Sequence, residues 1–311
     1  MKKASTILLA AAMACAMHSC FTGIESTPRI GDGELKRQHV STTPEQRFLS
    51  GVVAARPSQW QSGKEFYVTD SKINLIFTSA STGTDSLEGE VIHFCRFDSV
   101  PAVDSHSAAE MILTHGSDTL RWRPGFNLDE LAGRTRLDIP FSVDLDMVAQ
   151  VRSQLAGNTY YITTPLWYHP ATMQRSGGLR HVPVLIRDVQ PGTADMPLKV
   201  IFTPQTDRAD SSRRCVLMTI GDRRLATRNF DRLFAFENPR RRYPAITDEV
   251  WNLIINSKVR EGMTRDECRL ALGAPLQIIH GSGTLGTTER WSYPDGVYLI
   301  FDDGFLTRFR L

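Results

Sequence analysis

Short runs of alternating apolar and polar residues fill residues 46 to 240 and predict a β-rich region. Turn-favouring residues separate runs heavy in Val, Ile, Phe, Tyr and Thr. The clearest runs are EFYVTD from residue 65, INLIFTS from 73, EVIHFCRF from 90, TYYITTPLWY from 159, HVPVLIRDV from 181 and LKVIFTP from 198. One stretch has helical spacing instead. Val143, Met147, Val151 and Leu155 recur at every fourth position, which predicts a helix over residues 143–155.

A short pattern recurs within this β-rich region, once from Gly63 and once from Gly157. Both copies read G-x-x-aromatic-Tyr-β-branched-Thr, and each stands a few residues after a Ser-Gln pair. The recurrence suggests two related small β units. A chance match between two amphipathic strands is the alternative reading.

Helix signals become clear from residue 247 onward. Thr247 can cap a helix, and the acids that follow it favour the positive helix end. Thr264 and Glu267 form the spacing of a capping box, and Gly273 provides a stop signal for that second helix. Four strand-like runs follow: LQIIH, ERWSY, VYLIF and LTRFRL. Residues 241–311 are therefore predicted to be an α+β module of two helices and an antiparallel meander.

This C-terminal pattern resembles the SmpA/OmlA (BamE-like) family of outer-membrane lipoproteins, over residues 247–311 only. The matching residues are Val259, Gly262, Met263, Thr264, Glu267, Leu272, Gly273, Pro275, Trp291, Tyr293, Phe301 and Gly304. The same module also occurs, in tandem, in proteinaceous β-lactamase inhibitors. The resemblance implies a small lipid-anchored envelope domain that packs against other proteins as an accessory in outer-membrane protein assembly. Trp291, Tyr293 and Phe301 are expected either to fill the core or to face a partner.

The first residues have the features of a lipoprotein signal peptide, predicted as residues 1–19. Lys2 and Lys3 precede an apolar segment that is too short to span a bilayer. Cys20 follows it and resembles the cysteine of a bacterial lipobox, which becomes lipidated. A secreted protein, or a structural Cys20, is the alternative. The polar residues 20–45 are expected to tether the folded part to the outer membrane, facing the periplasm.

Charge disfavours a nucleic-acid partner. The chain has 36 Lys and Arg against 34 Asp and Glu, and loss of Lys2 and Lys3 with the signal peptide leaves equal numbers. Arginines are concentrated in one run, Arg240, Arg241 and Arg242. This run suggests a patch for anions or lipid headgroups, although a solvated linker would have the same composition.

The sequence contains no recognisable catalytic motif, and no cofactor or metal is expected. His169 and His181 do not have the spacing of a known ligand set. Cys95 and Cys215 could form one disulfide, or remain buried free thiols. We therefore expect a non-enzymatic binding or scaffold lipoprotein. The alternatives are a periplasmic lipid- or glycan-binding carrier, and an envelope enzyme whose site lies within residues 46–240.

Overall fold

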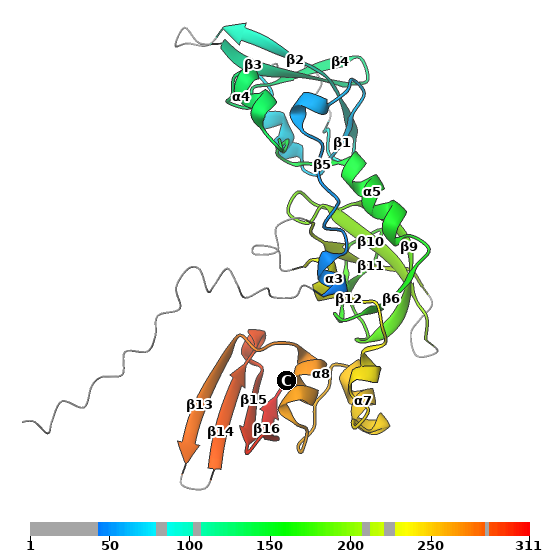
Figure 1. Ribbon diagram of the computed structural model, residues 1–311, viewed down its shortest axis with the longest axis vertical. Coiled ribbons are helices and arrows are strands. Elements are labelled where there is room, and N and C mark those ends of the chain that lie inside the picture. Colours follow the sequence, from blue (N-terminus) through cyan, green and yellow to red (C-terminus); the bar gives the residue numbers. More distant parts are fainter. Residues whose placement is uncertain (1–42, 79–85, 102–106, 207–211, 221–227, 284–285) are drawn as a thin grey trace, which may run out of the picture. The chain divides into compact units, whose positions relative to one another are not determined.

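Figure 1 shows the protein as a computed structural model. The structure describes residues 43–78, 86–101, 107–206, 212–220, 228–283 and 286–311. These residues form six α-helices and sixteen strands, and the strands make three antiparallel sheets. The prediction of a β-rich chain with some helices is therefore confirmed. Within the described ranges, no helix combines the length and the apolar character needed to cross a membrane.

The predicted signal peptide, Cys20 and most of the tether lie outside the described residues. The predicted end of the tether at residue 45 is wrong, because Thr43 already caps helix α3 (Pro44–Arg47). Thr43 and Gln46 exchange two hydrogen bonds of 3.1 and 3.2 Å in a capping box. Residues 43–45 thus belong to the folded part.

The first sheet has the strand order β4-β3-β2-β1-β5. Its strands are β1 (Glu65–Val68), β2 (Val91–Pro101), β3 (Ser107–His115), β4 (Asp118–Trp122) and β5 (Ser142–Asp144). The short helices η1 (Pro57–Gln59), η2 (Ser71–Leu75) and α4 (Leu128–Gly133) belong to the same region. Alternate side chains of a strand share a face, and Phe66, Ile92, Met111 and Leu120 meet in a first core.

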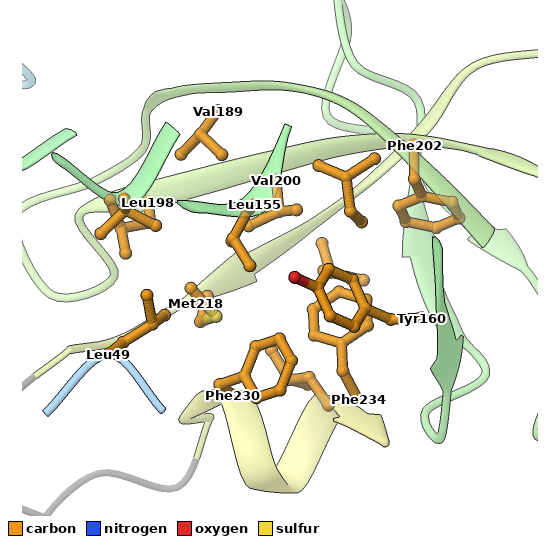
Figure 2. Packing of buried hydrophobic residues seen from close by; sticks show 14 of the residues in the cluster. Leu49, Leu155, Tyr160, Val189, Leu198, Val200, Phe202, Met218, Phe230 and Phe234 are labelled. Atoms are coloured by element: carbon orange, nitrogen blue, oxygen red, sulfur yellow. The ribbon is translucent and has the colours of Figure 1, made fainter. Parts of the chain in front are cut away.

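The second sheet has the order β12-β6-β9-β10-β11-β7-β8. Its strands are β6 (Thr159–Ile162), β7 (Leu166–Tyr168), β8 (Arg175–Gly177), β9 (Val182–Pro191), β10 (Leu198–Pro204), β11 (Arg214–Met218) and β12 (Phe234–Ala235). Helices α5 (Leu145–Leu155) and α6 (Phe230–Leu233) contribute to its core. Figure 2 shows the rings of Tyr160, Phe230 and Phe234 close together there, with the first two centroids 5.1 Å apart.

Helix α5 is slightly shorter than its predicted span of 143–155. Val143 belongs to β5, and Asp144 caps the helix by accepting a hydrogen bond from the Asp146 backbone. The apolar residues that predicted the helix, Val143 included, are nevertheless all buried in the second core.

The first two sheets share one topology. The order β5-β1-β2-β3-β4 in the first corresponds strand by strand to β12-β6-β9-β10-β11 in the second. Along the chain, helix α4 lies between β4 and β5, and helix α6 lies between β11 and β12. The chain that follows β1 returns to β4, where Phe77 pairs with Trp122. In the same way, the chain that follows β6 returns to β11, where Tyr168 pairs with Cys215.

The recurring sequence pattern lies at equivalent places in the two sheets. Gly63 and Gly157 both have positive φ, of 91° and 82°, just before β1 and β6. Each donates its backbone N–H to the neighbouring strand, Gly63 to Phe94 and Gly157 to Ile186. The two copies of the pattern therefore lie at equivalent positions in two sheets whose strand orders correspond.

A β-bulge follows at the same point of each sheet. Cys95 is the extra residue when β2 pairs with β3, and Arg187 is the extra residue when β9 pairs with β10. At the end of the sequence pattern, Thr69 and Thr163 both donate backbone and hydroxyl hydrogen bonds to the segment entering the edge strand. The equivalence thus extends from strand order to individual hydrogen bonds.

The last part of the chain contains a third sheet, ordered β13-β14-β15-β16. Its strands are β13 (Gln277–Gly283), β14 (Gly286–Ser292), β15 (Tyr298–Asp302) and β16 (Phe305–Arg310). Helices η3 (Pro239–Arg242), α7 (Asp248–Ile255) and α8 (Arg265–Leu272) precede it, and η4 (Pro294–Gly296) joins β14 to β15. Side chains from α7, α8, β14, β15 and β16 form a third core.

Candidate interaction surface on the C-terminal sheet

Helix α8 is fixed at both ends by the residues that predicted it. The Thr264 backbone N–H donates to Glu267 Oε2 at 2.8 Å, and the Glu267 N–H donates to Thr264 Oγ1 at 3.3 Å. Gly273 follows the helix with φ +89°, a conformation that favours glycine. The predicted capping box and stop signal are confirmed. The helix therefore has a defined position from which its apolar face can pack.

Trp291 and Phe301 are fully buried and lie 4.6 Å apart between ring centroids. Buried Cys268 and Ala271 of α8 belong to the same core. The expectation that these two aromatic residues face a partner is therefore wrong, because they lie on the sheet face that the helices cover. They fill the core, which was the alternative.

Tyr293 is half-buried and connects the end of β14 to the end of α8. Its hydroxyl donates to the Gly273 carbonyl at 3.1 Å. Burial raises the pKa of this phenol to about 12. Tyr293 is thus engaged in holding the helix to the sheet, as a neutral donor, and offers only part of its surface to any partner.

A polar cluster surrounds Glu289 on the same sheet face. This carboxylate accepts from the indole N–H of Trp291 at 2.9 Å and pairs with Arg265 at 3.1 Å. His280 of the edge strand β13 lies 3.5 Å from it. Arg269 stacks over the Trp291 ring at 4.8 Å. The cluster closes the helix-covered face on the side of β13, and sequence motifs did not mark it.

Large apolar side chains are exposed mainly on this C-terminal sheet. Within the described residues, nine such side chains are exposed, and six of them follow α8: Leu276, Ile278, Ile279, Phe305, Phe309 and Leu311. Scattered exposed apolar residues are normal on a protein surface. These six instead gather at the two edges of one sheet, three at the start of β13 or directly before it and three on β16 or directly after it. The C-terminal sheet is therefore our candidate interaction surface.

Three arginines lie on the face of the sheet opposite the helices. Arg290 pairs in register with Ile300, which pairs with Arg308, and Tyr298 pairs with Arg310. Directly paired residues point to the same face, so all five side chains share it. The three arginines are exposed, and none has a carboxylate partner within the described part of the chain. This face is consequently both positively charged and partly apolar.

Arg180, just before β9, joins the second sheet to α8. Its guanidinium donates to the carbonyls of Thr163 at 3.0 Å and Leu272 at 3.2 Å, and to the Ser257 hydroxyl at 3.2 Å. Burial lowers the pKa of Arg180 to about 10. Leu272 ends α8, where carbonyls lack helical partners and a cation is favourable. No sequence signal identified this residue.

The three arginines of the predicted patch, Arg240, Arg241 and Arg242, lie in the single short helix η3 and have different neighbours. Arg240 pairs with Asp248 at 3.0 Å, and its guanidinium lies 5.1 Å from the centre of the Trp251 ring. Arg242 lies 3.9 Å from Glu45, and Arg241 is exposed. Because two of the three already have carboxylate partners, the run does not present three free guanidiniums to an anion.

A cavity of about 490 Å³ lies beside Arg240 and has His181, Tyr161 and Trp251 in its lining. His181 has an Nε2 atom 3.1 Å from the Leu270 carbonyl, and burial lowers its pKa. His169 lies elsewhere, in the loop after β7. The two histidines noted in the sequence therefore do not meet in one site.

The described cysteines are all free, so the possible Cys95–Cys215 disulfide is not formed. Burial raises the pKa of the Cys215 thiol to about 11 and that of Cys268 to about 12. Such thiols stay protonated and are poor nucleophiles. In the ranges that the structure covers, no three His, Cys, Asp or Glu side chains are grouped so as to hold a metal ion.

No protein family, no curated protein and no solved structure matches this chain.

Proposed function

We propose that this chain is a lipid-anchored envelope protein that binds another protein through its C-terminal part and catalyses no reaction. The single observation that carries the proposal is the concentration of exposed apolar side chains in residues 276–311. A surface of this kind costs solubility unless a partner covers it. In the proposal, residues 241–311 act together as one α+β module of two helices and a meander, as the resemblance to the SmpA/OmlA family implies.

The anchor in this proposal is Cys20, with the chain attached to the outer membrane and facing the periplasm. Lipidation of Cys20 would keep the module at the membrane surface, where local concentration strengthens a weak protein contact. The partner is then an envelope protein, and the role is a scaffold in outer-membrane assembly or maintenance.

The proposal is tested by crosslinking in living cells of a bacterium that has an outer membrane. A photoreactive amino acid replaces Leu276, an exposed residue directly before β13, in the full-length chain, and a matched variant carries it at Leu75, an exposed residue of η2. Crosslinking from Leu276 to one envelope protein, but not from Leu75, is expected. Cys20→Ala should reduce that crosslink. Equal crosslinking from both positions, or none from Leu276 in a lipidated chain, would contradict the proposal.

A further inference from the structure

The open edge of the C-terminal sheet differs from every other sheet edge in the described part of the chain. The six edge strands are β4, β5, β8, β12, β13 and β16, and β13 is the longest, with seven residues. Its sequence, QIIHGSG, contains no Asp, Glu, Lys, Arg or Pro. Proteins usually protect edges with charges, proline or short strands, because unpaired backbone groups template further pairing.

The opposite edge of the same sheet provides the contrast. Strand β16 carries Arg308 and Arg310, whereas residues 276 to 281 along β13 are all exposed and uncharged, apart from a histidine. Leu276, Ile278 and Ile279 leave apolar surface beside the free backbone groups. Adjacent residues of a strand point to opposite faces, so Ile278 and Ile279 expose apolar surface on both sides of the sheet. A strand added here would gain backbone hydrogen bonds and cover both residues.

The charge around the edge selects what kind of strand fits. Ile279 is the register partner of Arg290, which in turn pairs with Ile300, next to Arg308. An added strand would lie two strand spacings, about 10 Å, from the backbone of Arg290. On the face that it shares with Ile279, the charged side chain nearest to the added strand would be Arg290 of β14, whereas Asp302 of the same face lies one strand farther away, on β15. A carboxylate is favoured there, while an apolar side chain is favoured opposite Ile278 on the other face.

We propose that β13 binds an extended segment of the partner protein as a fifth strand, and that this segment alternates acidic and apolar residues. This inference rests on the proposed function and adds the mode of binding and the chemistry of the partner. Backbone pairing supplies the attraction in such complexes, and alternate side chains supply the specificity. A second copy of this chain is a poorer fit, because its β13 has no acidic residue to meet the arginines.

The test uses the purified full chain with Cys20→Ala and two labelled peptides of about nine residues, the length of a strand. One peptide alternates Val with Glu, and the other alternates Val with Lys. Fluorescence anisotropy should show the Glu peptide binding at least about tenfold more tightly than the Lys peptide. Hydrogen exchange should slow in residues 276–283 when the Glu peptide is bound.

Two substitutions separate the edge from the charge. Ile279→Lys places a protecting charge on the edge and should weaken binding of the Glu peptide by about tenfold or more. Arg290→Glu should weaken the Glu peptide and strengthen the Lys peptide. Leu75→Lys changes an exposed apolar residue of η2, outside the C-terminal sheet, and should change neither. Because all three side chains are exposed, each variant should fold.

Several results would overturn the inference. Saturable binding of neither peptide would do so, as would binding that Ile279→Lys leaves unchanged or that protects other strands. Sedimentation showing a dimer that Ile279→Lys dissociates would assign the edge to a second copy. In cells, Ile279→Lys should abolish the crosslink from Leu276. If that crosslink persists, strand addition fails while the proposed function stands; if wild type gives no crosslink, the proposed function itself fails.

Discussion

In the first sheet, a single turn of helix, η1, precedes the first strand, whereas the eleven-residue helix α5 precedes the equivalent strand of the second sheet. Helix α5 contributes Met147, Val148, Val151 and Leu155 to the second core. Of the described residues, 22 are buried in the second core and 14 in the first. The strand order and bulge positions are nevertheless the same, so this topology tolerates cores of different size.

The features that the two sheets share concern the backbone. Each has a glycine with positive φ, a strand of four residues whose second and fourth side chains are buried, and a bulge in the next strand. Helices and loops between the strands differ. The hydrogen bonding around β1 and β6 is therefore what the two sheets have in common, whereas the helices and loops that connect their strands vary.

One side chain after the glycine shows how the periphery differs. Lys64 is buried, with its Nζ atom 2.7 Å from Asp144 and 2.5 Å from Asp146. At the equivalent place, Asn158 donates to the Gln154 carbonyl at 3.0 Å. Lys64 therefore ties the first sheet to the start of α5, which packs in the second core, whereas Asn158 holds the end of that same helix.

The largest expected effect comes from truncating equivalent core residues. Leu113 pairs with Phe94, and Phe202 pairs with Ile186, so the two occupy the same place in their sheets. Both are fully buried. Phe202→Ala should lower the free energy of unfolding by about 3–5 kcal/mol and Leu113→Ala by about 2–5 kcal/mol.

Urea unfolding followed by tryptophan fluorescence can assign each loss to a sheet. Trp60 and Trp122 belong to the first core and Trp167 to the second. The two cores are separate clusters of side chains. In a chain that retains only Trp60 and Trp122, Leu113→Ala should therefore lower the urea midpoint. In a chain that retains only Trp167, Phe202→Ala should lower it. A common shift at all three tryptophans would show that the sheets unfold as one unit.

A smaller effect is expected at the shared glycines. Gly63 and Gly157 have positive φ, and a Cβ at either position would meet no atom within 4 Å. The cost of Gly→Ala is therefore only that of the left-handed backbone, about 1–2 kcal/mol, and should be equal at the two sites. Thermal unfolding of both variants measures it. Gly133→Ala, in α4 with ordinary φ and equal space, is the control and should not destabilise; unequal losses at the two glycines would break the equivalence.

Sequence patterns identified the strands that alternate and the helix ends that have caps. The runs from 65, 90, 159, 181 and 198 fall on β1, β2, β6, β9 and β10. Strand β3 was missed because residues 109–113 are buried on both faces and do not alternate. Helix α4 was missed although Asn127 and Glu130 have capping-box spacing, a signal that was present. Local sequence patterns thus predict the elements that have one solvent-exposed face and one buried face.

The candidate surface could not be read from the sequence in the same way. Trp291 and Phe301 look like partner-binding residues, yet they are buried, whereas Ile278 and Ile279 look like core and are exposed. Which face of a sheet is covered depends on where helices pack, and edge position depends on strand order. Arg180 illustrates the same limit, because its partners Leu272 and Ser257 are distant in sequence. Such properties follow from tertiary structure rather than from local periodicity.

The smallest expected effect concerns how the stability of the two sheets depends on pH. Glu110 is buried in β3 and accepts hydrogen bonds of 3.0 Å from Arg121 and Arg123, whereas the equivalent residue of β10 is Lys199. Burial alone would raise the pKa of Glu110, but the hydrogen bonds and charges of Arg123 and Arg121 outweigh it, and the net pKa is lowered. A carboxyl group with a lowered folded-state pKa stabilises the protein above its unfolded pKa. That contribution is lost as the pH falls from about 4.3 through the folded-state value.

Glu110→Gln should therefore lower the free energy of unfolding at neutral pH by about 1 kcal/mol, a modest figure because both arginines are half-exposed. The difference from wild type should shrink steadily as the pH falls below about 4, since protonated Glu110 loses the same charge. Urea unfolding from pH 7 to pH 3 measures this convergence. Lys199→Gln, at the equivalent place in the second sheet, should leave the shape of the acid profile unchanged. Parallel profiles for wild type and Glu110→Gln would mean that the acid sensitivity of the first sheet arises from other carboxylates.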